Sequence, residues 1–471
     1  MDKPILLAGA PFLELYGARG VSYYFPLGIG YLASYLEKHG RTVRIIAESE
    51  GTDVYDELAA AIQTGEHLFV GISAMTPAFP AAVRLAKIVR RHAPGTPVVL
   101  GGPHASAMGA SILAEQDEFD FLCVGEGEIT ALELAGALAA QRTDFGDIRG
   151  LVWRDADGKV VANPPREFHA ELDDFPLPAR HLVDFDKFSL HSHVSLGQGR
   201  GATIVTGRGC PFGCIFCSAH LTSGRKPRFH SDDYVIGEIR LLRDRYGIRY
   251  LFLEDDTFTA VRERVRRLCR RITDEKLGVT LGCFSRVDVF DEELAGLLRD
   301  AGFRLVIFGI ESGVPEVLEK IRKGISLDKA RRAIELCRSH GIKSFASFVV
   351  GFPFETRELI ARTIDFGKGL DASVITFNPF VPFPGTPLFD PARHKPAAPD
   401  GWAKFLTTDE PPFDITPDTP ARELKAMVDR AHVAYYLRPK RLLGILRDTR
   451  SLSDLAALGK SFLIMLRRSV F

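Results

Sequence analysis

Short apolar segments alternate with amphipathic helical segments along most of this 471-residue chain. Before residue 145, each apolar segment has the length of a β-strand, and the segments between them place apolar residues at helical spacing. Such alternation is typical of an α/β domain, in which helices cover both faces of a parallel sheet. The predicted strands are Ile5–Ala10, Thr42–Ala47, Leu68–Ser73, Pro97–Gly101 and Phe119–Val124. The predicted helices are Leu27–His39, Val54–Gln63, Ala78–His92 and Ala110–Gln116.

The same alternation returns after residue 196 and continues to about residue 380. It predicts a second domain of repeated strand–helix units, whose functional groups gather at the carboxyl ends of the strands. The predicted strands are Ala202–Thr206, Tyr250–Leu253, Val279–Phe284, Leu305–Phe308, Lys343–Val350 and Ser373–Phe377. The predicted helices are Ser231–Asp244, Arg262–Lys276, Asp291–Ala301, Leu327–His340 and Glu355–Leu370.

A connector separates these two α/β regions. Ile148–Asn163 reads as a β-hairpin with Asp157-Gly158 at its turn, and the Pro- and acid-rich stretch around Asp173–Arg180 reads as a linker. We therefore expect a first domain over residues 1–145, a hairpin and linker over 146–195, a second domain over 196–390 and a C-terminal extension over 391–471.

Charge and cysteine content limit the binding partners and the cellular location that we expect. Lys+Arg and Asp+Glu number 60 each, so the chain has no overall field that would attract a nucleic acid. No apolar run reaches the length of a membrane span, and no signal peptide is visible at the N-terminus. The seven cysteines do not suggest a disulfide framework, so we expect a reducing, cytoplasmic location.

Three of the cysteines fall within eight residues, in the stretch RGCPFGCIFCSAH from Arg208 to His220. One interpretation is a zinc site in which His220 is the fourth ligand. The other is a site that keeps one coordination position open. Zinc motifs usually contain a second pair of ligands from another part of the chain, and the remaining cysteines are scattered. The pattern therefore favours the open site.

The spacing C-x3-C-x2-C of Cys210, Cys214 and Cys217, with Phe216 before the last cysteine, resembles the radical S-adenosylmethionine (radical SAM) superfamily. The resemblance implies that the three thiolates hold three irons of a 4Fe–4S cluster, and that the fourth iron binds S-adenosylmethionine. It also implies that the second domain is a partial (β/α)6 barrel.

The resemblance further implies that polar groups at the strand ends bind S-adenosylmethionine. Acidic residues that follow the second strand would accept the methionine amino group, and an arginine after the third would pair with the carboxylate. Residues after the fourth strand would bond the ribose, and the segment GFPFET would pack against adenine. These positions are Glu254, Asp255, Asp256, Ser285, Arg286, Glu311, Ser312 and Gly351. The alternative for each is a structural ion pair.

Glycine-rich strand ends in the first domain, in the order AGAPF, SAMTP, GGPH and GEGE, resemble the cobalamin-binding domain of cobalamin-dependent enzymes. That family has a flavodoxin-like or Rossmann-like fold with ligands beyond the carboxyl ends of its strands. The matching residues are Ser73, Met75, Thr76, Gly101, Gly102, His104, Gly125 and Glu126. The Asp-x-His-x-x-Gly motif is absent, so we expect cobalamin without that axial histidine. His104 is a candidate contact, and the alternative is that it satisfies local hydrogen bonds.

Together the two resemblances indicate a cobalamin-dependent radical SAM enzyme, a group that includes many methyltransferases acting on unactivated carbon. They imply hydrogen abstraction by a 5′-deoxyadenosyl radical and methyl transfer from methylcobalamin. One alternative is a ring closure, ring contraction or oxidation with the same cofactors. Another is a non-catalytic iron–sulfur or zinc sensor. Methylthio transfer needs three further cluster cysteines in the first domain, where only Cys123 lies.

The segment from Arg422 is predicted to be helical, and residues 438–471 carry eight Lys/Arg against two Asp. A basic amphipathic helix can lie on an anionic membrane, and the alternative is a helix docked on the barrel. This tail favours a lipid or secondary metabolite as substrate, with no nucleic-acid partner. The resemblance also implies an electron donor such as flavodoxin or ferredoxin.

Overall fold

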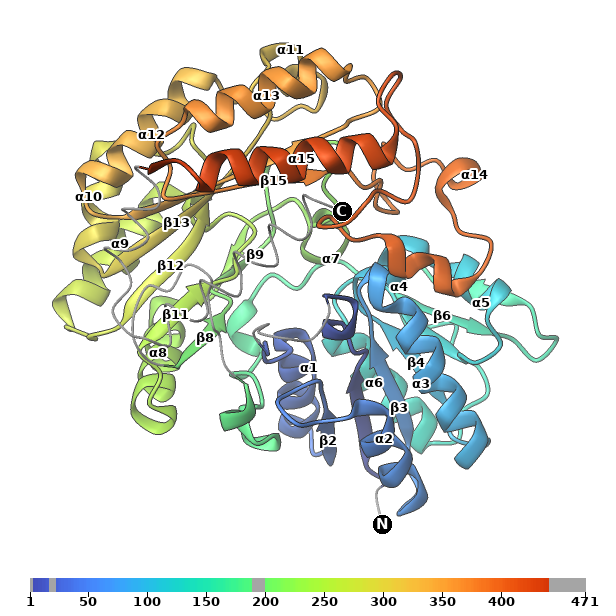
Figure 1. Ribbon diagram of the computed structural model, residues 1–471. Coiled ribbons are helices and arrows are strands. Elements are labelled where there is room, and N and C mark those ends of the chain that lie inside the picture. The colour runs from blue at the N-terminus through green and yellow to red at the C-terminus, as the bar shows by residue number, and fades with distance from the viewer. Residues whose placement is uncertain (1–2, 17–22, 189–199, 440–471) are drawn as a thin grey trace. The chain divides into compact units, whose positions relative to one another are not determined.

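A computed structural model describes residues 3–16, 23–188 and 200–439, and the predicted basic helix after residue 440 lies outside them. The chain forms two compact units (Figure 1). The first contains residues 1–283 and 382–403, and the second contains residues 284–381 and 404–471. In the part of the chain that the model describes, no helix has the length and apolarity needed to cross a bilayer.

The first unit begins with a seven-stranded sheet in the order β2-β1-β3-β4-β5-β6-β7. Its first five strands are mutually parallel, and their order is that of the flavodoxin-like fold. All five match predicted strands to within two residues at each end. Their bounds are β1 Ile5–Gly9, β2 Val43–Ile46, β3 Phe69–Ser73, β4 Val98–Gly101 and β5 Phe121–Cys123.

The predicted hairpin forms, but it is not a separate connector. β6 (Leu151–Arg154) pairs antiparallel with β5, and β7 (Val160–Ala162) pairs antiparallel with β6, so the hairpin extends the sheet. Trp153 and Phe121 face each other across this junction and bury against Phe145, which gives the hairpin an apolar contact with the sheet.

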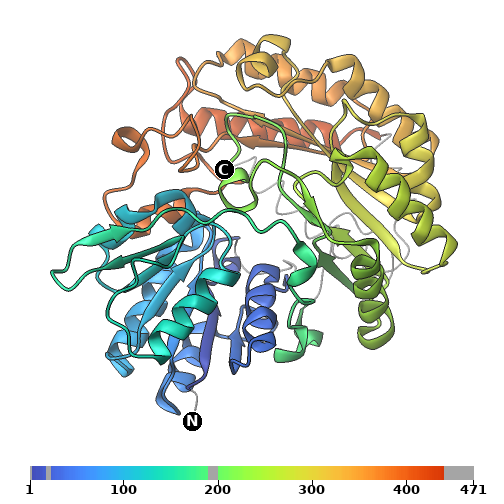
Figure 2. The same ribbon diagram turned by 180° about the vertical axis from the view of Figure 1, so that it is seen from behind.

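Helices connect the parallel strands, and α1 packs on α6 (Figure 2) while α2 packs on α3 (Figure 1). Asp53 caps α2, where its side chain accepts hydrogen bonds from the backbone N–H groups of Tyr55 and Asp56. The helices are α1 Leu27–Lys38, α2 Val54–Gln63, α3 Phe79–His92, α4 Pro103–Met108, α5 Ala110–Glu115 and α6 Glu128–Ala139. Helices α4 and α6 are absent from the prediction.

The first unit also contains the parallel strands β8 (Gly201–Ile204), β11 (Tyr250–Leu253) and β12 (Thr280–Ser285), whose last two residues belong to the second unit. Helices α8 (Asp232–Tyr246) and α9 (Arg262–Asp274) follow β8 and β11 in the chain. A short ribbon of β9 (Gly207–Arg208) and β10 (Arg228–Phe229) flanks the cysteine segment, which contains α7 (His220–Ser223).

The second unit contains three parallel strands in the order β13-β14-β15, and α15 packs on β15. The strands are β13 Phe303–Glu311, β14 Lys343–Val350 and β15 Val374–Pro379. The helices are α10 Glu292–Asp300, α11 Pro315–Lys320, α12 Leu327–Ser339, α13 Arg357–Gly369 and α15 Ala421–Tyr436. The remaining helix, α14 (Pro391–His394), belongs to the first unit. The six predicted strands are therefore all present in chain order.

Candidate functional site

The carboxyl ends of β1, β3, β4 and β5 are joined by hydrogen bonds between their loops. The N–H of Ala10 donates to the carbonyl of Ser73, and the N–H of Ala74 donates to the carbonyl of Gly101. The N–H of Gly125 donates to the hydroxyl of Ser106 on α4. These bonds bring the loops that carry the predicted cobalamin residues to one edge of the sheet, where α/β folds bind ligands.

Gly102 is required by the packing of this edge. Its φ is +89°, a conformation that disfavours residues with a side chain. A Cβ at this position would lie 2.7 Å from the hydroxyl of Ser73 and 3.0 Å from the backbone of Ala74. Gly125 also has a positive φ, but a Cβ there would meet only open space. Gly102 therefore allows the loop after β4 to pack against the loop after β3. Gly125 leaves open space beside the loop after β5.

His104 is packed inside the first unit. Its Nδ1 lies 3.2 Å from the hydroxyl of Thr76, and its ring contacts those of Phe79 and Trp402 at centroid distances of 4.3 and 4.9 Å. Burial lowers the pKa of His104 to about 3, so the ring is neutral at physiological pH. Met75, by contrast, is an apolar side chain that remains 44% exposed. Exposed apolar surface at a ligand-binding edge is available to a large planar ligand.

The ribbon of β9 and β10 closes the base of the cysteine loop. Gly209, with φ +100°, lies so close to the loop backbone that a Cβ would be 2.6 Å from the carbonyl oxygen of Lys226. The N–H of Cys210 donates to the carbonyl of Gly224 at 3.1 Å, and its Sγ lies 3.8 Å from the hydroxyl of Thr257. The loop is therefore held from both sides at its first cysteine.

Cys210, Cys214 and Cys217 are not joined in disulfides, and each has intermediate exposure. Nδ1 of His220 lies 3.2 Å from the carbonyl oxygen of Cys217, so this ring bonds its own loop. Within residues 3–16, 23–188 and 200–439, no three His, Cys, Asp or Glu side chains form a group that could hold one metal ion. Three separate thiols on a fixed loop instead fit a cluster of several irons, because thiolate is the usual protein ligand of such clusters.

The acidic run after β11 divides into three environments. Asp255 is buried and accepts hydrogen bonds from the N–H of Thr206 at 2.6 Å and of Gly207 at 3.1 Å, and its carboxylate lies 3.5 Å from Nη1 of Arg264. It therefore holds the chain between β8 and the ribbon.

Asp256 accepts hydrogen bonds from Ser223 and from the N–H of Gly209, both on the cysteine loop. The N–H of Glu254 donates to the carbonyl of Ile204 at 2.8 Å, but its side chain makes no hydrogen bond or ion pair with any described residue. Its side chain reaches solvent, yet protein surrounds much of the carboxyl group. This burial, together with the charge of Asp255, raises the pKa of Glu254 to about 7. Of the three, Glu254 is available for an ammonium ligand.

In the second unit, Arg286 is buried and forms a bidentate pair with Asp288 at 2.9 and 3.2 Å. Its Nη2 also donates to the carbonyl of Lys323 at 2.6 Å. Ser285 is buried, and its hydroxyl donates to the carbonyl of Arg286 at 3.3 Å. Arg286 thus has structural partners of its own, and a ligand carboxylate would have to share it with them.

Glu311 ends β13 in a left-handed conformation with φ +69°. Its carboxylate pairs with Nζ of Lys323 at 2.8 Å, and a Cβ at Gly309 would clash with both side chains. Strained backbone of this kind concentrates at functional sites. Ser312 is fully buried and shares a hydrogen bond with Thr363 at 2.9 Å. Between these two neighbours, Glu311 is therefore the stronger candidate for a ligand contact.

Gly351 begins the GFPFET segment with φ +90°. One carboxylate oxygen of Glu355 accepts hydrogen bonds from the N–H groups of Gly351 and Phe352 at 2.7 and 2.9 Å. Its other oxygen is buried without a hydrogen-bond partner among the described residues. Burial raises the pKa of Glu355 to about 7. The two hydrogen bonds fix the backbone of residues 351–355 in a turn around the Glu355 carboxylate. A fixed backbone of this kind is expected of a loop that packs against a ligand.

Two family models match the chain: the radical SAM superfamily over residues 204–367 and the B12 binding domain over residues 14–135. An uncharacterized methyltransferase of Pyrococcus horikoshii is 35% identical over 420 residues, covering 89% of each chain. The chain belongs to the B12-binding branch of the radical SAM superfamily. A magnesium-protoporphyrin IX monomethyl ester cyclase of Rubrivivax gelatinosus is 30% identical over 379 residues, covering 79% of this chain and 67% of the cyclase.

A solved structure has the same overall fold as this chain. The radical S-adenosylmethionine methyltransferase TsrM of Kitasatospora setae, with cobalamin and a 4Fe–4S cluster bound, matches with a TM-score of 0.68. The identity is 23%, and the match covers 82% of this chain and 74% of TsrM. As a member of this branch the chain is an enzyme, and its cofactors are a 4Fe–4S cluster, S-adenosylmethionine and cobalamin.

Several residues that shape these sites are absent from the sequence prediction. Arg208 and Arg228 on the ribbon, Arg264 on α9, and Lys323 and Glu355 in the second unit each form buried polar contacts. The signal available in the sequence was weak, because each is a single charged residue in a helix, turn or short strand. Three glycines lie beside Arg208, Lys323 and Glu355 and were a further signal, because none of them has room for a Cβ. They are Gly209, Gly309 and Gly351.

Proposed function

We propose that this chain is a cobalamin-dependent radical SAM methyltransferase that methylates an unactivated carbon of a small apolar metabolite or lipid. The observation that carries the proposal is the loop of Cys210, Cys214 and Cys217, which offers three thiols and directs His220 to its own backbone. Three protein ligands leave one iron of a 4Fe–4S cluster open. When bound, the cofactors supply radical hydrogen abstraction and a transferable methyl group.

The protein's own residues would bind and orient these groups. Glu254 would accept the ammonium of the methionine moiety, and Asp256 would hold the cysteine loop beside it. Arg286 would share its guanidinium with the methionine carboxylate, and Glu311 would bond the ribose hydroxyls. The loops with Ser73, Gly101, Gly102 and Gly125 would receive cobalamin, and the exposed Met75 would pack against its ring.

The names of similar proteins support methyl transfer and a small-molecule substrate. The uncharacterized Pyrococcus horikoshii relative is named as a methyltransferase, and a TsrM structure has tryptophan bound as its substrate. The balanced charge of the chain also disfavours a nucleic acid. A reduced cluster requires an electron, so we propose flavodoxin or ferredoxin as the donor.

The second candidate is a ring-forming reaction with the same cofactors, which the similarity to the Rubrivivax gelatinosus cyclase favours. One experiment separates the two. The anaerobic enzyme, loaded with both cofactors, is incubated with a cell extract and methyl-labelled S-adenosylmethionine. Methyl transfer predicts both 5′-deoxyadenosine and S-adenosylhomocysteine, with label in a product. Formation of 5′-deoxyadenosine without S-adenosylhomocysteine or labelled product would refute methyl transfer and support the ring-forming alternative.

A further inference from the structure

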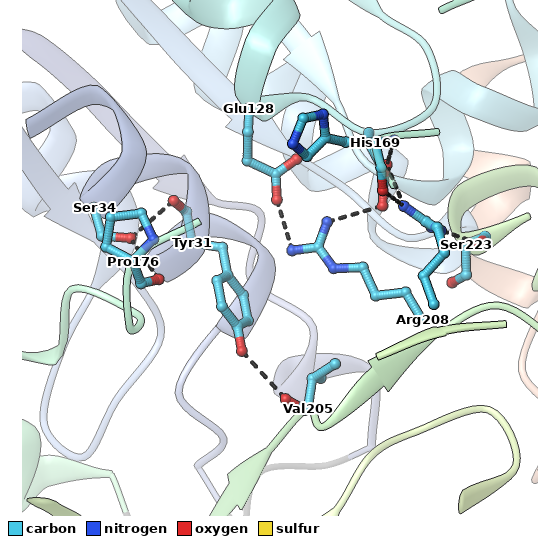
Figure 3. A network of polar contacts seen from close by, with 10 residues as sticks. Tyr31, Ser34, Glu128, His169, Pro176, Val205, Arg208 and Ser223 are labelled. Carbon is cyan, nitrogen blue, oxygen red and sulfur yellow. Dashed lines mark hydrogen bonds and ion pairs between the residues drawn. The ribbon is translucent and has the colours of Figure 1, made fainter. Parts of the chain in front are cut away.

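Two arginines and two glutamates form a buried charge network in the first unit. Nη1 of Arg208 lies 3.0 Å from Glu126, and its Nη2 lies 2.8 Å from Glu128. Nη1 of Arg228 lies 2.9 Å from the other carboxylate oxygen of Glu126. Figure 3 shows the Arg208 guanidinium pointing toward Glu128, with His169 and Ser223 nearby. The two carboxylates balance the two guanidinium charges.

Protein surrounds most of this network. The four side chains are between 6% and 12% exposed. The Arg208 guanidinium stacks on the rings of Tyr31 and Phe175, at 5.0 and 5.1 Å from their centroids. Arg228 also donates to the carbonyls of His169 and Ser223 at 2.7 and 2.9 Å. A buried pair of this kind is strongly disrupted when one partner is removed.

The network joins two parts of the chain that are distant in sequence. Arg208 and Arg228 face each other across the β9–β10 ribbon, which closes the base of the cysteine loop. Glu126 follows Gly125 at the carboxyl end of β5, on the edge proposed to receive cobalamin. The Glu126 carboxylate thus contacts Arg208 on β9 and Arg228 on β10. Glu126 itself lies in the loop after β5, which is part of the proposed cobalamin site.

We propose that Glu126 is a positioning residue that acts through Arg208 and Arg228 to fix the cysteine loop relative to the cobalamin-binding edge. It contacts neither cofactor in this assignment. Its two oxygens each hold one arginine, so the loop and the edge move as one body. The inference rests on the cofactor sites of the proposed function, but not on methyl transfer as the reaction.

The direct test is the magnetic interaction between the two cofactors in the loaded enzyme. A reduced 4Fe–4S cluster accelerates the spin relaxation of nearby cob(II)alamin, and this effect depends steeply on their separation. We compare wild type, Glu126→Gln and the control Glu133→Gln by power saturation of the cob(II)alamin signal. Glu133 lies on α6 and pairs with Arg166, but its side chain is 42% exposed.

We expect one relaxation rate in wild type and in Glu133→Gln, and a broad distribution that includes slower rates in Glu126→Gln. Cobalamin affinity and iron content should stay within about twofold of wild type, since Glu126 contacts neither group. Relaxation in Glu126→Gln identical to that of the control would overturn the proposal. So would weakened cobalamin binding with unchanged relaxation in the loaded fraction, because Glu126 would then be a cofactor contact.

A second variant keeps the test decisive if Glu126→Gln does not fold. Arg208→Lys retains the charge but replaces the two guanidinium nitrogens, which bond Glu126 and Glu128 separately, with a single ammonium nitrogen on a shorter side chain. Arg208→Lys should broaden the distribution of cob(II)alamin relaxation rates as Glu126→Gln does, although residue 208 lies on the ribbon and not on the cobalamin-binding edge. The double variant should then show little further change, as expected for residues of one network. Wild-type relaxation in Arg208→Lys would overturn the proposal.

The catalytic consequence is uncoupling of the two half-reactions. Displacement by about 1 Å can reduce the rate about 100-fold, so product formed per 5′-deoxyadenosine should fall about 10- to 100-fold in Glu126→Gln. This ratio is defined for any product, methylated or not. If wild type forms no methylated product, the proposed function fails, while the relaxation measurement still decides the role of Glu126.

Discussion

Asp255 is predicted to stabilise the start of the cysteine loop and not to bind a cofactor. Its carboxylate accepts hydrogen bonds from the N–H and hydroxyl of Thr206 and from the N–H of Gly207, and it faces Arg264. Both charged side chains are only 4% exposed. Replacement of Asp255 by alanine therefore leaves a buried guanidinium without its counter-ion and two backbone donors without an acceptor.

Removal of one partner of a buried ion pair costs about 3–5 kcal/mol. Lost acceptors cost about 1–3 kcal/mol each, but these contributions overlap with the first and are not added in full. Since about 1.4 kcal/mol corresponds to a factor of ten, the open state around Thr206 should become about two to four orders of magnitude more populated in Asp255→Ala.

Hydrogen exchange measures this opening directly, because amide protection reports local unfolding. The peptide that contains the Thr206 and Gly207 amides should exchange faster by that factor in Asp255→Ala, and by less in Asp255→Asn, which keeps one oxygen acceptor. Asp244→Ala is the control, since Asp244 pairs with Arg243 on the surface and is 60% exposed. Equal exchange in Asp255→Ala and in the control would refute the reasoning. So would normal protection together with lost affinity for S-adenosylmethionine.

Two further predictions concern the ligand-facing residues. Glu254 must be ionised to bind an ammonium, and its pKa is raised to about 7, so affinity for S-adenosylmethionine should rise as the pH increases from about 6 to about 7, below the range in which an α-ammonium itself loses its proton. Glu254→Gln should weaken binding and remove this pH dependence in equilibrium titrations, and an unchanged pH profile in the variant would exclude the assignment. Cys214→Ser should lose most of its iron after anaerobic reconstitution, whereas His220→Ala should retain it, as measured by metal analysis. Iron loss in His220→Ala equal to that in Cys214→Ser would instead make His220 a ligand.

The sheet of the first domain was predictable because its strands are buried on both faces. Segments such as Ile5–Gly9 and Phe69–Ser73 are continuous apolar runs, and helical periodicity between them leaves few other folds. The added strands β6 and β7 were predicted as a hairpin but not as part of the sheet. Their alternation predicts pairing with each other, and their pairing with β5 depends on tertiary contacts of Trp153.

The candidate sites were predictable as positions but not as contacts. The cysteine spacing and the strand-end location of residues 254–256 are local patterns in the sequence. Which of these three carboxylates faces inward depends on Arg264, which lies on the following helix. Glu126 was predicted as a cofactor contact, and its observed bonds are to Arg208 and Arg228, which lie 82 and 102 residues away in the chain. Such distant pairing leaves no short-range signal.

The open coordination position is the central feature of this account, and electron paramagnetic resonance of the reduced, anaerobically reconstituted enzyme tests it most directly. The three thiols, on a loop where His220 bonds the carbonyl of Cys217, predict that S-adenosylmethionine binds the cluster itself. We therefore predict that the cluster spectrum changes when S-adenosylmethionine is added and that this change is lost in Cys217→Ser together with the cluster. A colourless, zinc-containing protein, or a cluster spectrum indifferent to S-adenosylmethionine, would contradict the account.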